Sequence, residues 1–186
     1  TPLKTLIQHS LDPYAVNDDA RPQITPFFTY YTNTPEVDPY IHQFYRNVHH
    51  PIGFKILYRT VGNIINPKIV SKILPFFLWA FILLGLGKTA YKLGGTKASV
   101  LILVLATLSP IFWDRLAGGL PRSFAFPGLA LIIMTLSQKK WTTSLMLIGL
   151  TTAFYPVAGA IGSTWLFMSL LLQGITSNIP LNKVSL

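Results

Sequence analysis

The stretch IVSKILPFFLWAFILLGLG, residues 69–87, decides the fold. It is 19 residues long and carries a single charge, Lys72, near its start. A helix of about 20 apolar residues spans the roughly 30 Å hydrocarbon core of a bilayer. Lys72 is close enough to the end of the stretch for its long side chain to reach the headgroups. The stretch therefore predicts a transmembrane helix.

The composition extends this prediction to a polytopic membrane protein. The chain is 51% hydrophobic and 11% charged, whereas about 25% of the residues in a soluble domain are charged. Four more apolar segments follow the first: residues 98–113, 123–136, 142–155 and 157–172. The last two are separated at Pro156, because one helix over both would be about 46 Å long and proline disfavours helix at the residue before it.

We therefore expect an all-α fold, a polytopic integral membrane helical bundle of about five segments over residues 69–175. A non-cytoplasmic loop region, residues 1–68, precedes this bundle, and a tail, residues 176–186, follows it. Proline stands at seven of the first 51 positions, which excludes long helices from most of the loop region.

Residues 52–66 differ from the rest of the loop region. Their apolar residues recur at helical spacing, with Lys55 and Arg59 between them. This pattern predicts a short amphipathic helix in the membrane interface, with the two cations toward the headgroups. The side chains expected to point into the membrane are Ile56, Leu57, Ile64 and Ile65. An ordinary surface helix that packs on its own loop is the alternative.

The distribution of charge predicts the orientation of the bundle. Two loops carry lysines and no acid: Lys88, Lys92 and Lys97 in the first, and Lys139 and Lys140 in the second. Loops rich in lysine stay on the cytoplasmic side of a membrane, and alternation of the five segments brings both loops to one side. All six carboxylates and all four histidines then belong to the other side.

The most unusual polar motif is the acidic pair Asp18–Asp19 in NDDAR, residues 17–21. Two adjacent carboxylates can supply a general base, because one raises the pKa of the other. They can also bind a divalent metal such as Mg²⁺ or Mn²⁺, which prefers carboxylate oxygens. An Asx-turn or a helix N-cap is the structural alternative. Arg21, beside the pair, is a candidate substrate-binding residue.

A second polar motif is WDRLAGGLPRSFAFP, residues 113–127. Asp114, Arg115 and Arg122 lie at a predicted membrane boundary, where an unpaired charge is costly. An arginine there suits a phosphate or a carboxylate, so these three are also candidate substrate-binding residues. The alternative is an ion pair of Asp114 with one of the arginines that only fixes the loop. Gly118 and Gly119 allow either a close approach of the backbone or a positive φ.

Other functions are disfavoured by the composition. The chain has no cysteine, so it offers neither disulfides nor thiolate chemistry. Its net charge of +9 does not indicate a nucleic-acid partner, because the cations are scattered singly or in pairs and suit membrane lipid headgroups. His42, His49 and His50 do not have the spacing of a standard metal site.

The N-terminal region resembles the acidic first loop of bacterial GT-C type membrane glycosyltransferases and related proteins. The resemblance lies in the string NDDARPQITPFFTYY, which is followed by DPYIHQFYR and a helical membrane domain. The resemblance covers roughly residues 14–125. It implies transfer of a sugar from a polyprenyl-phosphate donor at the outer face of the bacterial inner (plasma) membrane. Asp18 or Asp19 would activate the acceptor or support a metal, and Arg115 or Arg122 would contact the donor phosphate.

The family layout also has a helix before the acidic loop and more helices after the bundle. We therefore expect this chain to be a fragment of a longer protein. The alternative functions are a transporter and a membrane protein without enzymatic activity. A transporter is disfavoured because no acid lies within an apolar segment and no pair of broken helices recurs in matching halves.

Overall fold

The computed structural model describes residues 40, 43, 50–62, 64–65 and 67–178. Within these residues the regular structure is helical, without strands, so the predicted all-α class is confirmed for this part of the chain. The acidic pair, Arg21 and the aromatic string that follows them lie outside the described residues.

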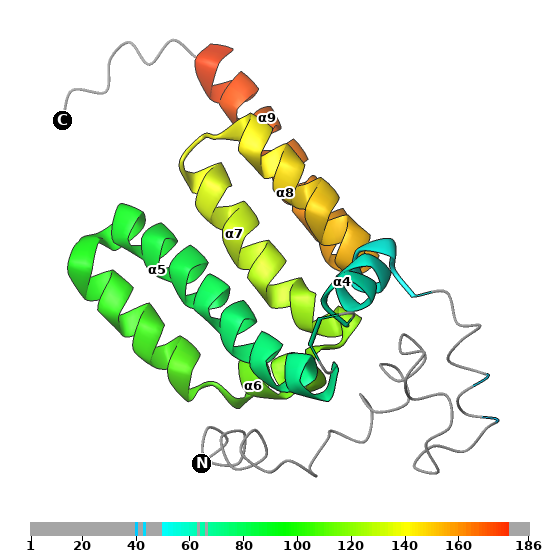
Figure 1. Cartoon of the computed structure of the whole chain (residues 1–186). Coiled ribbons are helices and arrows are strands. Elements are labelled where there is room, and N and C mark those ends of the chain that lie inside the picture. Colours follow the sequence, from blue (N-terminus) through cyan, green and yellow to red (C-terminus); the bar gives the residue numbers. More distant parts are fainter. Residues whose placement is uncertain (1–39, 41–42, 44–49, 63, 66, 179–186) are drawn as a thin grey trace.

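Six α-helices and two short 3₁₀ segments follow one another in this part of the chain (Figure 1). They are α4 (Ile52–Gly62), α5 (Pro67–Leu108), α6 (Pro110–Leu116), η3 (Ala117–Gly119), η4 (Pro121–Phe124), α7 (Ala125–Ser137), α8 (Trp141–Phe154) and α9 (Pro156–Asn178).

Helix α5 is a hairpin of two limbs, residues 67–93 and 96–108, and not one rod (Figure 1). Gly94 and Gly95 have non-helical backbone angles, and Gly95 has a φ of 70°, which residues other than glycine rarely adopt. Across the turn, the Ser99 hydroxyl donates to the Gly87 carbonyl over 3.1 Å. The second limb therefore folds back along the first.

Two predicted boundaries in this region are wrong. The first apolar segment was expected to end at residue 87, but its helix continues to the glycine turn. The second was expected over 98–113, but α5 ends at Leu108 and α6 starts at Pro110. Ser109 is extended, with a ψ of 118°, because proline disfavours helix at the residue before it.

The later helices agree closely with the predicted segments. Helices α7, α8 and α9 each begin within two residues of the expected positions. The break predicted before Pro156 is present, since Tyr155 has the extended angles φ −149° and ψ 95°. Helix α9 then runs back along α8 (Figure 1).

The first limb of α5 packs on α7 in one constant register. A β-carbon added to Gly119 would lie 3.1 Å from Leu74, and one added to Gly85 would lie 2.5 Å from the carbonyl carbon and oxygen of Ala130. Farther along, Lys92 donates to the Ser137 carbonyl. All three pairs are separated by 45 residues, so the first limb of α5 runs parallel to the segment from η3 through α7.

A stripe of buried residues on the first limb of α5 explains this register. Its members follow one another at alternating steps of four and three residues: Ser71, Pro75, Leu78, Ile82, Gly85 and Thr89. This spacing keeps one narrow face of a helix against a partner. The small side chains of Ser71, Gly85 and Thr89 let the partner backbone come close, as is common between membrane helices.

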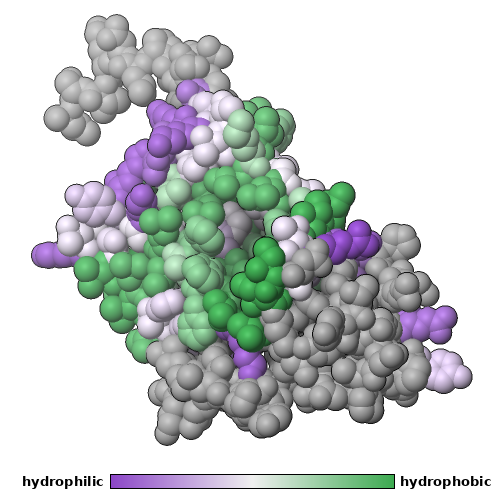
Figure 2. Space-filling view, viewed as in Figure 1, coloured by the Kyte–Doolittle hydropathy of each residue, from purple (hydrophilic) through white to green (hydrophobic). Residues whose placement is uncertain are grey.

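The outer surface of the helices is apolar. Figure 2 shows hydrophobic residues over much of the face in view, and large apolar side chains are exposed on every long helix, among them Phe77, Leu101, Met146, Leu150 and Phe167. A soluble monomer rarely exposes apolar patches larger than a few hundred Å². Two helical stretches, Ile69–Leu108 and Pro156–Gln173, are long and apolar enough to cross a membrane.

The contact between α5 and α7 gives a first prediction. Gly85→Ala would force a methyl group against the Ala130 backbone, so we expect a loss of about 1–3 kcal/mol in the free energy of unfolding. Thermal unfolding of the chain in detergent micelles, followed by circular dichroism, measures this loss as a lower Tm.

Gly149→Ala is the matched control. Gly149 is exposed within α8, and an added β-carbon meets no atom within 4 Å. We expect this variant to be neutral or slightly more stable, because alanine favours helix over glycine. Equal Tm values for the two variants would contradict the close approach of α5 and α7.

Candidate functional site

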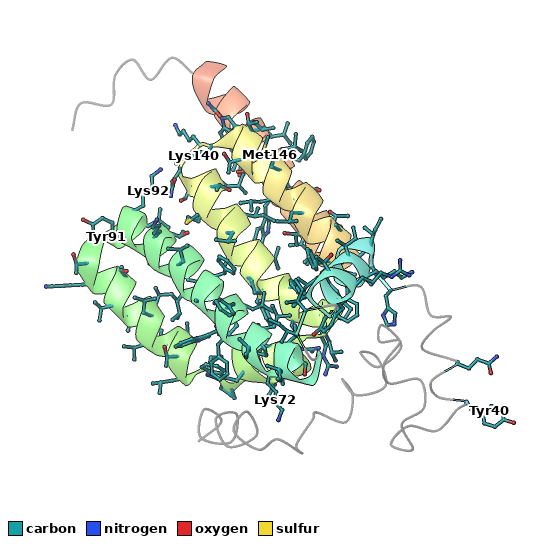
Figure 3. All side chains as sticks on the ribbon, in the orientation of Figure 1. Tyr40, Lys72, Tyr91, Lys92, Lys140 and Met146 are labelled. Carbon is teal, nitrogen blue, oxygen red and sulfur yellow. The ribbon has the colours of Figure 1, made fainter. Side chains whose placement is uncertain are left out.

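The loops of the bundle gather at two opposite ends. At the first end, the Lys92 ammonium donates to the Ser137 carbonyl, which joins the α5 hairpin turn to the turn between α7 and α8. Lys92 and Lys140 lie near each other at this end, whereas Lys72 lies at the other (Figure 3). We call the first the lysine end and the second the loop end. As predicted, the two lysine-bearing turns lie on the same side of the bundle.

The loop end is built around α4. The Tyr58 hydroxyl donates to the Gly119 carbonyl over 3.0 Å, and both groups are buried. The Phe54 ring packs on Tyr58 with centroids 4.6 Å apart. Phe124 of η4 stacks on Phe154 at the end of α8, with centroids 4.2 Å apart. These contacts hold α4, the loop between α6 and α7, and the end of α8 together.

The prediction for α4 needs a correction. The helix ends at Gly62 and not at residue 66, and Leu57 packs against the protein core beside Phe54 instead of pointing into the membrane. Because one helix turn takes 3.6 residues, Phe54, Leu57 and Val61 share one face, and that face contacts the bundle. Ile56 is 58% exposed on another face, which also carries the exposed Arg59.

The loop between α6 and α7 needs its two glycines. Gly118 and Gly119 have φ values of 80° and 60°, one of the two possibilities that the sequence analysis left open. A β-carbon on Gly119 would also lie 2.8 Å from the Tyr58 hydroxyl oxygen. Farther along, the Ser123 hydroxyl donates to the Leu116 carbonyl over 3.2 Å. The loop is therefore fixed by neutral hydrogen bonds on both sides of Arg122.

The candidate charges of this loop occupy different environments. Asp114 and Arg115 are exposed at the end of α6, whereas Arg122 is half-buried in η4. Within the described residues, Asp114 forms no ion pair with either arginine. The alternative in which such a pair fixes the loop is thus not observed, and the neutral hydrogen bonds do this instead.

Sequence reasoning missed three residues of the loop end. Tyr58 and Ser71 are buried there, and Lys72 is half-buried next to Ser71. A β-carbon on Gly119 would lie 3.5 Å from the Cα atom of Ser71, so the glycine loop covers the start of α5. The sequence signal for Lys72 was its place near the end of an apolar segment, which we interpreted only as snorkelling.

The chemistry of the loop end favours an anion. Lys72, Arg115 and Arg122 supply three cations there in addition to Lys55 and Arg59 of α4, and Asp114 is the single described carboxylate. Guanidinium and ammonium groups at a membrane boundary suit phosphate or carboxylate ligands. Within the described residues, no group of three His, Cys, Asp or Glu side chains could hold a metal ion, and the acidic pair proposed for that role lies outside them.

Comparison of the chain with protein-family models, with curated proteins and with solved structures finds no match.

The buried phenol at the loop end gives a second prediction. Burial raises the pKa of Tyr58 above its usual value of about 10. The neutral phenol therefore stabilises the folded chain below pH 10 or so, and this contribution is lost as the pH rises further toward the folded-state pKa. We expect the Tm to fall above about pH 10, and to fall less steeply in Tyr58→Phe.

At neutral pH the same variant should lose roughly 1 kcal/mol of stability, because the Gly119 carbonyl loses its donor. Tyr91→Phe is the control, since Tyr91 is 61% exposed at the α5 hairpin, and it should change neither the Tm nor its pH dependence. If Tyr58→Phe behaves like Tyr91→Phe in a pH series of melting curves, the buried hydrogen bond is refuted.

Proposed function

We propose that the chain is part of a multi-pass membrane glycosyltransferase of the GT-C type. It would transfer a sugar from a polyprenyl-phosphate donor at the non-cytoplasmic face of a bacterial inner membrane. In this proposal the loop end faces outward and the lysine end faces the cytoplasm, in keeping with the positive-inside rule. Both limbs of α5 cross the membrane, as do α7, α8 and α9.

The observation that carries the proposal is the docking of α4. This helix follows directly on the segment that contains the acidic pair, and Tyr58 ties it to Gly119 in the arginine-bearing loop. His50, the residue at which the continuously described chain leading into α4 begins, contacts Phe54 with ring centroids 5.4 Å apart. The described chain therefore begins its path through the bundle, at His50, on the end that carries Lys72 and Arg122, which supports a shared site.

The proposed division of labour follows from the charges. A carboxylate of Asp18 or Asp19 takes the proton of an acceptor hydroxyl, whose oxygen attacks the anomeric carbon of the sugar. The bond between that carbon and the phosphate oxygen breaks, and the polyprenyl phosphate leaves. Arg122 and Lys72 offset the negative charge that builds on the phosphate, and Arg21, Asp114 and Arg115 border the substrates. A divalent metal held by the acidic pair would add to the same charge compensation.

The proposed orientation can be tested with cysteines, because the chain has none of its own. Thr60 on α4 and Thr96 at the α5 hairpin are both exposed and lie at opposite ends. In sealed cells or vesicles, a membrane-impermeant maleimide should label Thr60→Cys from the outside. It should label Thr96→Cys only after the membrane is opened. Labelling of both positions from the same side would reject the topology.

The catalytic proposal predicts the effect of removing each charge of the acidic pair. Asparagine can replace aspartate in an Asx-turn, but it cannot act as a base or supply a negative charge to a metal. We expect Asp18→Asn or Asp19→Asn to lower sugar transfer at least about 10²-fold. The Tm should stay nearly unchanged. The assay uses membranes from cells that express the complete reading frame, with polyprenyl-phosphate sugars as donors.

Asp38→Asn is the control, because it removes a carboxylate from the same region away from the pair. It should leave transfer within a few-fold of the parent. Full activity in both variants of the pair, or a loss that follows a lower Tm, would make the acidic pair structural and remove the main support for a transferase.

A further inference from the structure

The lysine end has a property that the proposed sugar transfer does not use. Five lysines are all exposed there, three on the limbs of α5 beside the hairpin turn and two in the turn between α7 and α8: Lys88, Lys92, Lys97, Lys139 and Lys140. The Lys92–Ser137 hydrogen bond holds the two turns together. In Figure 2, hydrophilic residues gather along the upper left edge, where Figure 1 has these turns. The lysines therefore form one cationic surface.

Nothing acidic in the described chain offsets this charge. Asp114 is the single acidic residue after Asp38 in the sequence, and it lies in α6, away from the lysine end. The turn that carries Lys139 and Lys140 is also tightly built, with the Lys140 amide donating to the Thr135 carbonyl over 3.0 Å. Lys139 has a φ of 56°, which is uncommon for a residue other than glycine. Lys139 and Lys140 therefore lie side by side in a turn with a constrained backbone, where their like charges repel each other.

Apolar side chains lie beside the cations. Leu93 is 78% exposed and Tyr91 is 61% exposed at the hairpin, and Met146 is 70% exposed on α8, one to two turns beyond Lys140. Met146 and Lys140 are seen together at the top of the view in Figure 3. Cations at the rim with apolar side chains next to them match a phospholipid, which presents a charged headgroup beside its acyl chains. A soluble phosphate would use only the cations.

We propose that the lysine end is a binding surface for anionic phospholipids, which it selects over zwitterionic ones through their headgroup charge. This inference rests on the membrane placement proposed above, and it does not depend on the transferase activity. Attraction to an anionic leaflet corresponds to an affinity gain of about 5-fold per lysine near the surface. The surface would therefore enrich anionic lipid around the hairpin and the α7–α8 turn.

The test places a fluorophore at this end. Thr143 is exposed in the first turn of α8, and a bimane label on Thr143→Cys would report the neighbouring lipids. The full chain is reconstituted in bilayers that contain dibromo-phosphatidylglycerol or dibromo-phosphatidylcholine, and the quenching by each gives their relative affinity. We expect phosphatidylglycerol to be preferred several-fold. Lys139→Gln with Lys140→Gln should bring that preference close to equal quenching by the two lipids, and raising the NaCl concentration to a level that screens surface charge should lower it as well.

Three controls test whether the lipid preference comes from the charge of the lysine end. Lys55→Gln with Arg59→Gln removes the same charge from α4 at the loop end and should leave the preference unchanged. Lys139→Arg with Lys140→Arg keeps the charge and should keep the preference. If the glutamine variant fails to incorporate, the salt dependence of the phosphatidylglycerol preference is measured with the label on Thr143→Cys and with a label on Thr60→Cys. Only the preference reported by the label at the lysine end should respond strongly to salt.

Three results would overturn the inference: equal quenching by the two lipids, an equal loss in the Lys55–Arg59 control, or equal salt responses at the two label positions. A soluble phosphate site would show itself differently. Glycerol phosphate would then abolish the preference at an ionic strength at which NaCl does not. If neither lipid quenches the label, the proposed membrane placement is rejected. That outcome differs from equal quenching by both lipids, which rejects only the selection of anionic lipid.

Discussion

The contact of Gly85 with the backbone of Ala130 sets the register on which the rest of the bundle depends. Between helices in a bilayer, where we propose that this bundle lies, association gains little from the hydrophobic effect, so close packing of small residues and hydrogen bonds decide it. At this contact there is no room for a side chain on α5. The parallel register that follows brings Lys92 to Ser137 at one end and Gly119 to Leu74 at the other. One steric fit therefore determines which loops meet at each end.

Backbone chemistry was the most predictable part of the fold. Proline imposes its effect on the preceding residue whatever the surroundings, and for that reason the break before Pro156 was predicted correctly. The positive φ of Gly118 and Gly119 was anticipated on similar grounds. The end of the first α5 limb was not predicted correctly, because Lys88 and Lys92 end the apolar pattern without ending the helix. The helix stops only where Gly94 and Gly95 leave helical angles.

Contacts between elements could not be predicted in the same way. In a membrane protein both the lipid-facing and the protein-facing sides of a helix are apolar, so periodicity does not separate them. Leu57 was assigned to the lipid for this reason, but it packs on the core. Of the candidate site, the sequence singled out Arg115 and Arg122 because they were predicted to lie at a membrane boundary. It missed Tyr58 and Ser71, because their roles exist only once α4 and the glycine loop have met.

Helix length adds a constraint on where the proposed chemistry takes place. Helix α8 has 14 residues, about 21 Å of helix, whereas the hydrocarbon core of a bilayer is about 30 Å thick. In the proposed placement, the membrane must thin beside α7 and α8, or their ends must lie below the headgroups. Arg122 stands just before α7 and is half-buried. A cation in such a recessed position is screened less by water, and a phosphate on a lipid carrier reaches it from within the membrane. The short helices therefore fit a lipid-linked donor. Because the lipid carrier is itself held in the membrane, its phosphate can contact an arginine that lies below the headgroups.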